Sequence, residues 1–433
     1  MTKSFIKSFS VYGLFGKDDV HIPFDENIKI LIGENGVGKT QVLNIFYYTL
    51  TKNFFKLGEL PFEKIKIEFN DELVIIERKK IIEFLNERKY FLKRKIITGR
   101  DFIADDLHEY EYEIELIEGK NSYITQKRKK RRPKNIELSP YLVDCSNIID
   151  NNLNKKNILY FPTFRRVEED LHNLGYDEEE LSLNKEDTRL IHFGMDDVQK
   201  RFDTVEKRID SLLKEGFTKI SSEILSKLVK GFGDTNKKII DKISETDIDI
   251  ILARVGDQIS DTEKSKIREI VLNKEVSNID NSLFYFIQTL VEIYEKQKKL
   301  DESINRFKEV CNGYLISKQV FYDESNIKIY IKSDKSSEPL ALNKLSSGEK
   351  QIISIFSKIY LSEDERQFIV LFDEPELSLS MPWQKKLLPD ILASKKCDFL
   401  LAVTHSPFIF DNELDLYAMG LNEYIQSQNK VTA

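Results

Sequence analysis

A run of residues near the start of the chain has the types and spacing needed to bind the phosphates of a nucleotide. With the residue that follows it, the run comprises Gly33, Glu34, Asn35, Gly36, Val37, Gly38, Lys39, Thr40 and Gln41. It matches the pattern G-x-x-x-x-G-K-[ST], in which glycines let successive backbone N–H groups face phosphate oxygens. We expect Lys39 to reach the β- and γ-phosphates and the Thr40 hydroxyl to join the coordination shell of Mg²⁺. The run therefore predicts nucleotide binding.

Two apolar strands far along the chain end in residues suited to hydrolysis. The run 368–372 is followed by Asp373 and Glu374, and the run 399–404 by His405. The carboxyl end of a buried parallel strand is where an α/β sheet places its ligands. Asp373 is predicted to hold Mg²⁺ and Glu374 to polarise the attacking water as general base. His405 is predicted to contact the γ-phosphate or hold that water; a structural role is the alternative.

A loop of small residues precedes the acidic strand and forms a third candidate element. It contains Ser346, Ser347, Gly348 and Glu349, followed by an apolar helix over 352–361. Such a loop offers backbone N–H groups and a hydroxyl to an anion. An ordinary helix cap is the alternative interpretation. The position just before the acidic strand favours a role in the nucleotide site.

The elements around these motifs predict an α/β fold. Half-buried strands should alternate apolar and polar residues, whereas amphipathic helices repeat apolar residues every three to four positions. Strands are predicted over 5–14, 20–24, 28–32, 64–69, 73–76, 110–116, 157–162, 318–322, 327–331, 368–374 and 399–406. Helices are predicted after Thr40 and over 81–97, 205–213, 220–229, 264–272, 283–307 and 352–361. Between about 170 and 315 the composition changes, and Glu, Lys and Leu dominate. This change indicates a helical insertion.

Two clusters of basic residues leave alternatives open. Residues Lys127–Lys134 are almost all Lys or Arg, which suits contact with nucleic-acid phosphates or with an acidic partner. A solvated loop is the more common interpretation of such a run. The strand over 157–162 leads into Thr163–Arg166, where two arginines could sense a bound phosphate. A surface pair neutralised by the acidic residues that follow is equally compatible.

The amino-acid composition is that of a globular protein without membrane-spanning segments. The 433 residues carry a net charge of −7, with 41% hydrophobic and 32% charged residues, which is typical of a globular protein. No apolar run approaches the roughly 20 residues that span a bilayer, so no membrane association is expected. Three dispersed cysteines and the lack of a signal peptide predict a cytoplasmic location. Five scattered histidines do not suggest a structural metal site.

Taken together, the motifs resemble those of the ABC-type ATPase heads. Residues 33–40 resemble the Walker A motif, 345–349 the signature loop (usually LSGGQ) and 368–374 the Walker B motif, with His405 as the switch histidine. The resemblance implies a head with a mixed sheet, in which a phosphate-loop core adjoins an antiparallel β part. The head would comprise 1–165 and 318–433, with 166–317 inserted as a helical domain.

The resemblance also implies a mechanism. In such ATPases two heads sandwich ATP and Mg²⁺, so Ser346 and Gly348 of one subunit would face the Lys39 loop of another. The protein is then expected to self-associate as a dimer or a higher homo-oligomer, and to hydrolyse ATP slowly. Ser347 and Glu349 replace the usual glycine and glutamine, as in soluble relatives that maintain and repair chromosomes. No glutamine is assigned to the Q-loop.

A narrower resemblance is to the ATPase subunits of bacterial anti-phage defence systems such as PARIS and Septu, and to the heads of OLD-family nucleases. The segments that carry it are 160–166, 193–198 and 374–379, although Ser380 stands where relatives usually have histidine. It implies a subunit that senses a phage protein or foreign nucleic acid and controls a separate nuclease or toxin. Neither trigger nor effector follows from the residues themselves.

Two other functions remain compatible with the sequence. A DNA repair ATPase of the SMC or RecF type would bind DNA in an ATP-dependent manner, with Lys127–Lys134 as the predicted contact. A transporter energy subunit is less favoured, because the inserted segment between Thr40 and Leu345 is far longer than in a transporter's nucleotide-binding domain. Such a subunit would also fractionate with membranes.

Overall fold

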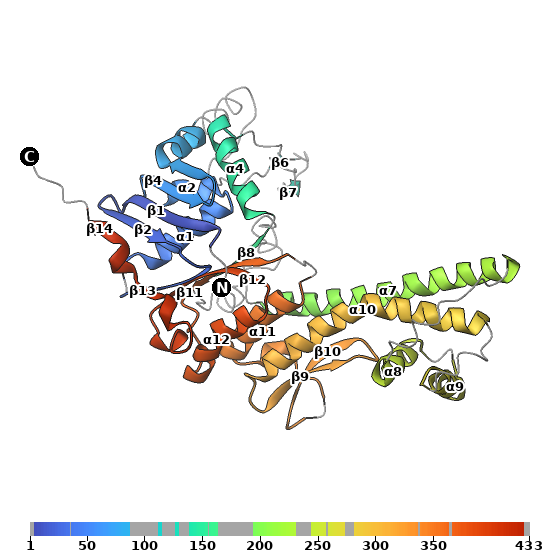
Figure 1. Ribbon diagram of the computed structural model, residues 1–433. Coiled ribbons are helices and arrows are strands. Elements are labelled where there is room, and N and C mark those ends of the chain that lie inside the picture. The colour runs from blue at the N-terminus through green and yellow to red at the C-terminus, as the bar shows by residue number, and fades with distance from the viewer. Residues whose placement is uncertain are drawn as a thin grey trace, which may run out of the picture. The chain divides into compact units, whose positions relative to one another are not determined.

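The chain forms two compact units in a computed structural model. The model describes residues 4–34, 36–86, 111–114, 126–129, 138–154, 156–162, 194–230, 244–256, 259–272, 281–336, 338–362 and 366–427. One unit contains Met1–Ile158 and Met419–Ala433, and the other Leu159–Ala418 (Figure 1). The division of the chain at 165 and 317 stays a prediction.

The first unit is built on an antiparallel sheet. Its order is β14 (Ile425–Ser427), β2 (Asp18–Pro23), β1 (Ile6–Leu14), β4 (Lys64–Phe69) and β5 (Leu73–Glu77). In β4 every second side chain is buried, because apolar and charged residues alternate with the period of the strand. Phe9 of β1 pairs with Ile67 of β4. The aromatic ring of Phe9 meets that of Phe46 edge to face, with centroids 4.8 Å apart.

Phe46 belongs to α1 (Lys39–Leu50), the helix that begins in the phosphate loop. Its apolar residues Val42, Leu43 and Phe46 are fully buried, as their spacing predicts. The strand β3 (Ile28–Ile32) precedes the loop, so the predicted order of strand, loop and helix is confirmed. The remaining elements of this unit are α2 (Phe54–Glu59), β6 (Glu111–Ile114), β7 (Gln126–Lys129) and α4 (Pro140–Leu153).

Parallel strands at the centre of the second unit carry the acidic motif. β11 (Phe368–Asp373) lies between β12 (Cys397–Thr404) and β8 (Asn157–Phe161), and it runs parallel to β12. All six β11 side chains are buried, which explains why the sequence shows an unbroken apolar run. The rings of Phe161 and Phe372 stack with centroids 4.3 Å apart. The parallel pairing here and the antiparallel sheet of the first unit confirm the predicted mixed α/β fold class.

Two long helices of the second unit lie side by side: α7 (Met195–Lys230) and α10 (Asn281–Asn312) (Figure 1). The sequence predicted two helices over 205–213 and 220–229, but the structure has one continuous helix there. Gly216 lies between the two predicted segments, where a Cβ would come within 2.3 Å of Ile293 Cδ1. The glycine therefore permits close approach of α10 and does not interrupt α7.

Among the described residues, the second unit contains further helices and strands besides its central strands and these two helices. They are α8 (Glu245–Arg254), α9 (Asp261–Leu272), β9 (Lys318–Asp323), β10 (Lys328–Ser333), α11 (Ser347–Tyr360) and α12 (Met381–Ala393). Short 3₁₀ turns lie at Leu342–Lys344, Pro407–Ile409, Asp415–Tyr417 and, in the first unit, Leu421–Tyr424; β13 is Ala418–Gly420. No helix among the described residues is long and apolar enough to cross a membrane.

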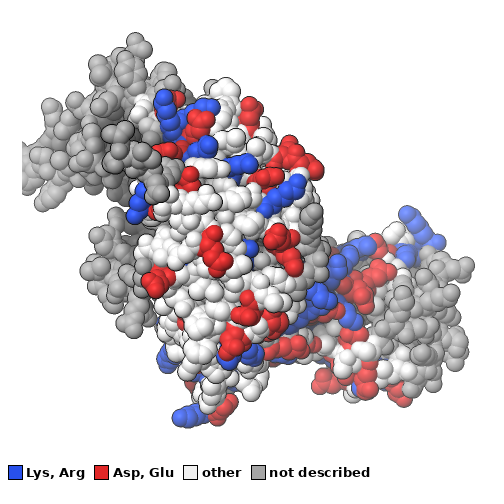
Figure 2. All heavy atoms as spheres, turned by 60° about the vertical axis from the view of Figure 1, so that its left-hand side comes forward, with Lys and Arg blue, Asp and Glu red and all other residues white. Residues whose placement is uncertain are grey.

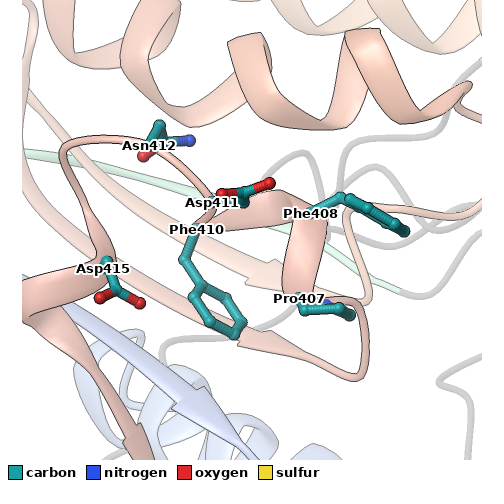
Figure 3. A pocket seen from close by; sticks show the side chains of 6 residues that line it. All are labelled: Pro407, Phe408, Phe410, Asp411, Asn412 and Asp415. Carbon is teal, nitrogen blue, oxygen red and sulfur yellow. The ribbon is translucent and has the colours of Figure 1, made fainter.

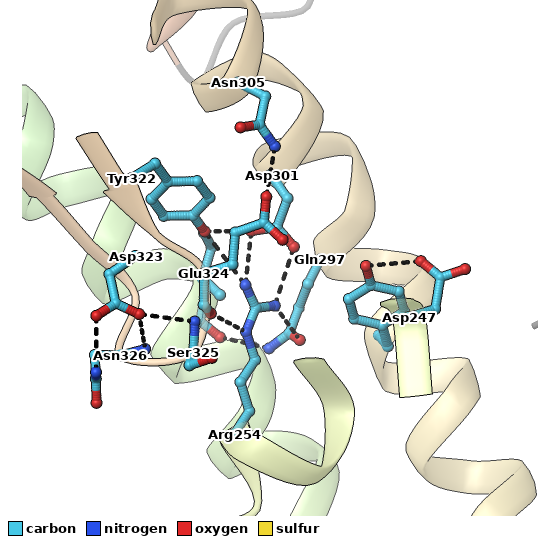
Figure 4. Close-up of polar contacts among 12 residues, drawn as sticks. Asp247, Arg254, Gln297, Asp301, Asn305, Tyr322, Asp323, Glu324, Ser325 and Asn326 are labelled. Carbon is cyan, nitrogen blue, oxygen red and sulfur yellow. Dashed lines mark hydrogen bonds and ion pairs between the residues drawn. The ribbon is translucent and has the colours of Figure 1, made fainter. Parts of the chain in front are cut away.

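A buried ion pair joins α8, α10 and the β9–β10 hairpin (Figure 4). Arg254 Nη1 donates to Asp301 Oδ2 and to Gln297 Oε1, both at 3.0 Å, and Nη2 donates to Asp301 Oδ1 at 2.8 Å. The Nε atom donates to the carbonyl of Glu324 at 2.9 Å. Burial acts to lower the pKa of the Arg254 guanidinium, but the bonds to Asp301 outweigh it and raise that pKa. Arg254 is therefore charged, and its guanidinium donates to Asp301, Gln297 and the carbonyl of Glu324.

Replacing Arg254 with methionine should destabilise this region strongly, because Asp301 would keep a buried charge without its cation. Removing one partner of a buried pair costs about 3–5 kcal/mol. Arg268→Met is the matched control, since Arg268 pairs with Glu245 and Asp249 at the surface, where such pairs contribute only about 0–1 kcal/mol. Thermal denaturation measures both variants; equal losses would contradict the assignment of Arg254 as a buried anchor.

Candidate functional site

The phosphate loop has the backbone conformation that its glycines allow. Gly36 and Gly38 have φ values of 87° and 93°, in the left-handed region that favours glycine. Gly38 is the N-cap of α1 and provides no side-chain cap. The first N–H groups of a helix have no partner within the helix, and its N-terminus carries partial positive charge. This loop therefore fits a phosphate group.

Lys39 folds back over the loop that precedes it. Its Nζ atom donates to the carbonyl oxygens of Gly33 and Glu34 at 2.6 and 2.8 Å. The side chain is thus held at the loop, beside the backbone that would surround the phosphates. In the next residues, the buried Oε1 of Gln41 has no hydrogen-bond partner among the described residues. An orphaned acceptor beside Thr40 fits a site that is completed by a ligand.

The acidic strand end and His405 come together in the second unit. Asp373 is 3% exposed at the end of β11. The next residue, Glu374, donates its N–H to the carbonyl of Val403 in β12 at 2.8 Å. Its Oε1 atom lies 3.6 Å from Nε2 of His405, which follows the end of β12. Adjacent parallel strands therefore bring the predicted general base and the predicted switch residue into contact.

Glu374 lies in a turn with unusual backbone conformations. It has φ 51° and Ser378 has φ 63°, although neither is glycine. Such conformations cost energy and persist only where surrounding contacts hold them. Gln351 Nε2 of α11 donates to the carbonyl of Pro375 at 3.2 Å, and Gln384 Nε2 of α12 donates to that of Leu379 at 2.9 Å. Two helices thus hold the turn that follows the acidic strand.

The small-residue loop forms the helix cap that its sequence allows. Ser346 Oγ accepts from the N–H of Glu349 at 3.4 Å, and Glu349 Oε2 accepts from the N–H of Ser346 at 2.7 Å. The Glu349 carboxylate also pairs with Lys318 Nζ at 2.7 Å. Burial acts to raise the pKa of the Glu349 carboxyl, but the bonds from Lys318 and Ser346 outweigh it and lower that pKa. Its carboxylate is therefore engaged within the chain, whereas Ser346 and Ser347 are exposed.

Gly348 lies against the turn of the acidic motif. A Cβ at this position would come within 2.4 Å of the carbonyl oxygen of Ser378 and within 3.2 Å of the Trp383 ring. Real Cβ atoms do not approach a backbone oxygen so closely, so glycine is required sterically. The first turn of α11 and the turn after Glu374 therefore fix each other's positions.

Gly348→Ala should move one of these two turns. We expect a folded protein whose ATPase rate falls about 10- to 100-fold, since a displacement near 1 Å can have that effect on a catalytic geometry. Gly420→Ala is a suitable control, because Gly420 has φ −63° and a Cβ there would meet nothing nearer than 3.5 Å. Steady-state hydrolysis measures both. Equal rates in the two variants would show that the contact with Ser378 is dispensable.

A cavity of about 370 Å³ is lined by residues that follow His405 in the sequence (Figure 3). Its rim includes Asp411, which forms an ion pair with Lys385 at 2.6 Å. The lining residues are Pro407, Phe408, Phe410, Asp411, Asn412 and Asp415. None of the predicted nucleotide ligands lines this cavity, so we do not assign it to ATP.

Several predicted residues are divided between units or lie outside the described part of the chain. The phosphate loop belongs to the first unit, and the small-residue loop, Asp373, Glu374 and His405 belong to the second. Asn35, Thr163–Arg166 and 130–134 of the basic run lie outside the described residues. Gln351 and Gln384, which hold the turn after Glu374, were not among the predicted residues, and neither was Glu376, which accepts from the N–H of His405. The third carboxylate in Asp-Glu-Pro-Glu is the signal that could have identified Glu376.

Comparison with known proteins agrees with the chemistry of these residues. The AAA ATPase domain family matches the chain over residues 6–410. The chain belongs to this family. This AAA ATPase domain protein matches no curated protein in sequence. The roles of the phosphate loop and of the acidic strand end stay predictions.

Two solved structures are similar to this AAA ATPase domain protein over most of their length. One is an Smc head bound to the C-winged helix domain of ScpA, at 13% identity. The other is an Smc head domain with an extended coiled coil bound to the C-terminal domain of ScpA, derived from Pyrococcus furiosus, at 14% identity. In both cases the match covers 94% of this chain and 91% of the other, with a TM-score of 0.38.

Proposed function

We propose that this chain is an ABC-type ATPase that binds ATP with Mg²⁺ at the phosphate loop and hydrolyses it. The observation that carries the proposal is the pair Glu374 and His405, 3.6 Å apart at the ends of adjacent parallel strands. Glu374 takes a proton from the attacking water, and His405 holds the water or the γ-phosphate. Lys39 and the loop amides bind the phosphates, while Thr40 and Asp373 hold Mg²⁺. The magnesium ion would neutralise charge on the phosphate oxygens.

The second part of the proposal is that ATP binds between two copies of the chain. Ser346 and Ser347 are exposed at the N-terminus of α11, where hydroxyl and N–H groups suit an anion from outside the subunit. In this arrangement Gly348 allows the loop to approach its own acidic turn. Glu349 contributes by holding the loop in shape through Ser346 and Lys318. ATP then stabilises a dimer or a higher homo-oligomer.

The third part is that ATP binding controls a separate effector. The motif segments resembling PARIS and Septu ATPases support a sensor in anti-phage defence, triggered by a phage protein and acting on a nuclease or toxin. The helices α7 and α10 suit this role, because they give the second unit an extended surface beyond its strands. A cytoplasmic location accompanies this proposal.

Hydrolysis and control are tested together in one preparation. The purified chain should release phosphate from ATP only with Mg²⁺, and co-expression with its genomic neighbours should yield a stable complex with a nuclease or toxin. Hydrolysis without any such partner would support the ATPase and remove the effector role. Absence of hydrolysis in the chain, both alone and with its neighbours, would overturn the ATPase assignment.

An SMC- or RecF-like DNA-binding ATPase is the second candidate, because β7 carries Lys127, Arg128 and Lys129. On the face drawn in Figure 2, however, basic and acidic side chains are interspersed over the described residues. In this candidate, binding to DNA depends on the run Lys127–Lys134. Neutralising the run should abolish ATP-dependent DNA binding at low salt if this candidate is correct. No affinity of the wild-type chain for DNA would eliminate it.

A further inference from the structure

The carboxylate of Glu376 holds the turn that carries the switch histidine. Its Oε2 atom accepts from Thr404 Oγ1 at 2.7 Å. Its Oε1 atom accepts from the backbone N–H of His405 at 2.8 Å and from that of Ser406 at 3.2 Å. Three consecutive residues thus donate to one side chain. Hydrogen bonds to a charged carboxylate are shorter and stronger than those to a neutral acceptor.

The backbone at His405 is held by these hydrogen bonds and not by pairing within the sheet. Thr404 is the last residue of β12 and is fully buried, so the strand ladder ends one residue before the histidine. Beyond that point the chain turns into the 3₁₀ segment that begins at Pro407. The hydrogen bond from the N–H of His405 to Glu376 therefore determines the direction of the backbone at this residue.

Glu376 is itself held in place by the acidic turn. The N–H of Leu379 donates to its carbonyl oxygen at 3.1 Å, and Gln384 Nε2 donates to the same oxygen at 3.4 Å. Gln384 also accepts from the hydroxyl of Ser406 at 2.6 Å. The turn that contains Glu374 and the turn that contains His405 are thus joined twice, once through Glu376 and once through Gln384. Both connections lie within the second unit.

We propose that Glu376 is a positioning residue that holds the imidazole of His405 against Glu374. The inference rests on the proposed ATPase function and adds to it a residue that does not touch the nucleotide. Without the carboxylate, the backbone N–H of His405 loses this acceptor, whereas that of Ser406 keeps Thr404 Oγ1 at 3.0 Å. The turn is then free to rotate the imidazole away from Oε1 of Glu374. Glu376 acts as a hydrogen-bond acceptor here and neither as a base nor as a metal ligand.

Three variants separate positioning from other roles. Glu376→Ala should lower kcat for ATP about 30- to 100-fold with KM within about threefold of wild type, because geometry and not ATP binding is lost. Glu376→Gln should retain activity within about threefold: its amide oxygen can accept from both N–H groups, and its NH₂ can donate to the Thr404 hydroxyl. Glu413→Gln is the matched control, since Glu413 is exposed. Equal losses in the Gln and Ala variants would overturn the proposal in favour of a role that needs the negative charge.

A double-mutant cycle with His405→Ala is decisive, because residues that act as a unit are not additive. If Glu376 acts through the histidine, Glu376→Ala should cause no further loss of kcat in the His405→Ala background. Multiplicative losses would show that Glu376 only stabilises the fold, and an unchanged rate in His405→Ala alone would equally overturn the inference. Failure of the ATPase function is distinguished by the wild-type protein, which would then hydrolyse no ATP at all.

Discussion

Glu374→Gln should lower kcat for ATP hydrolysis by about 10²- to 10⁴-fold, the range contributed by a positioned general base. Glutamine has nearly the same size as glutamate and can occupy the same turn, but it cannot take a proton from water. Binding of ATP and Mg²⁺ should be retained, because Lys39, Thr40 and Asp373 are untouched. The variant should therefore accumulate as an ATP-bound oligomer.

Single-turnover hydrolysis measures the chemical step, and mass determination with and without ATP and Mg²⁺ measures the assembly. Glu413→Gln serves as the control for loss of a negative charge in the same unit, at an exposed position. Wild-type turnover in Glu374→Gln would exclude Glu374 as the general base. A monomer that ATP does not change would contradict binding between subunits, even if hydrolysis were lost.

Lys39→Ala should abolish ATP binding at the concentrations where the wild type is saturated. The ammonium group is expected to pair with the β- and γ-phosphates, and loss of one partner from such a pair costs about 2–5 kcal/mol, or roughly 30- to 5,000-fold in affinity. The variant also loses the two bonds to Gly33 and Glu34 that hold the loop in shape. Both effects weaken the same site.

Titration with a fluorescent ATP analogue in the presence of Mg²⁺ measures this affinity directly. Lys66→Ala is the matched control, because Lys66 lies in β4 of the same unit and pairs with Glu68 at the surface. Its affinity for the analogue should equal that of the wild type. Binding of ATP by Lys39→Ala with an affinity near that of the control would place the nucleotide elsewhere than the phosphate loop.

The sequence predicted most elements of the fold because each signal is local. The alternation in β4, the unbroken apolar run of β11 and the glycines before α1 depend on neighbours within a few residues. The same is true of the cap at Ser346, where serine and glutamate lie three residues apart. The roles of the candidate ligands follow from the motifs and stay predictions until variants test them.

Other features depend on residues that are far apart in the sequence. Arg254 meets Asp301 only because α8 packs against α10, and composition gives no sign of that pairing. The bond from the N–H of His405 to Glu376 joins residues that are separated in the sequence by α12 and β12. A glycine within a helix is locally unfavourable, and the benefit of Gly216 comes from Ile293 on another helix. Tertiary packing determines each of these.

Because α7 is long, a small tilt near one of its ends produces a large displacement at the other end. Its 36 residues span roughly 54 Å at 1.5 Å per residue. Near one end, Arg201 Nη1 donates to Ser357 of α11 at 2.8 Å, and Glu206 accepts from the backbone N–H of Ile329 at 2.8 Å. With the pivot at these bonds, a tilt of about 10° in α11 would move the far end of α7 by roughly 7 Å. Conversely, α7 would act as a lever, so a force applied at its far end would act with greater strength on α11.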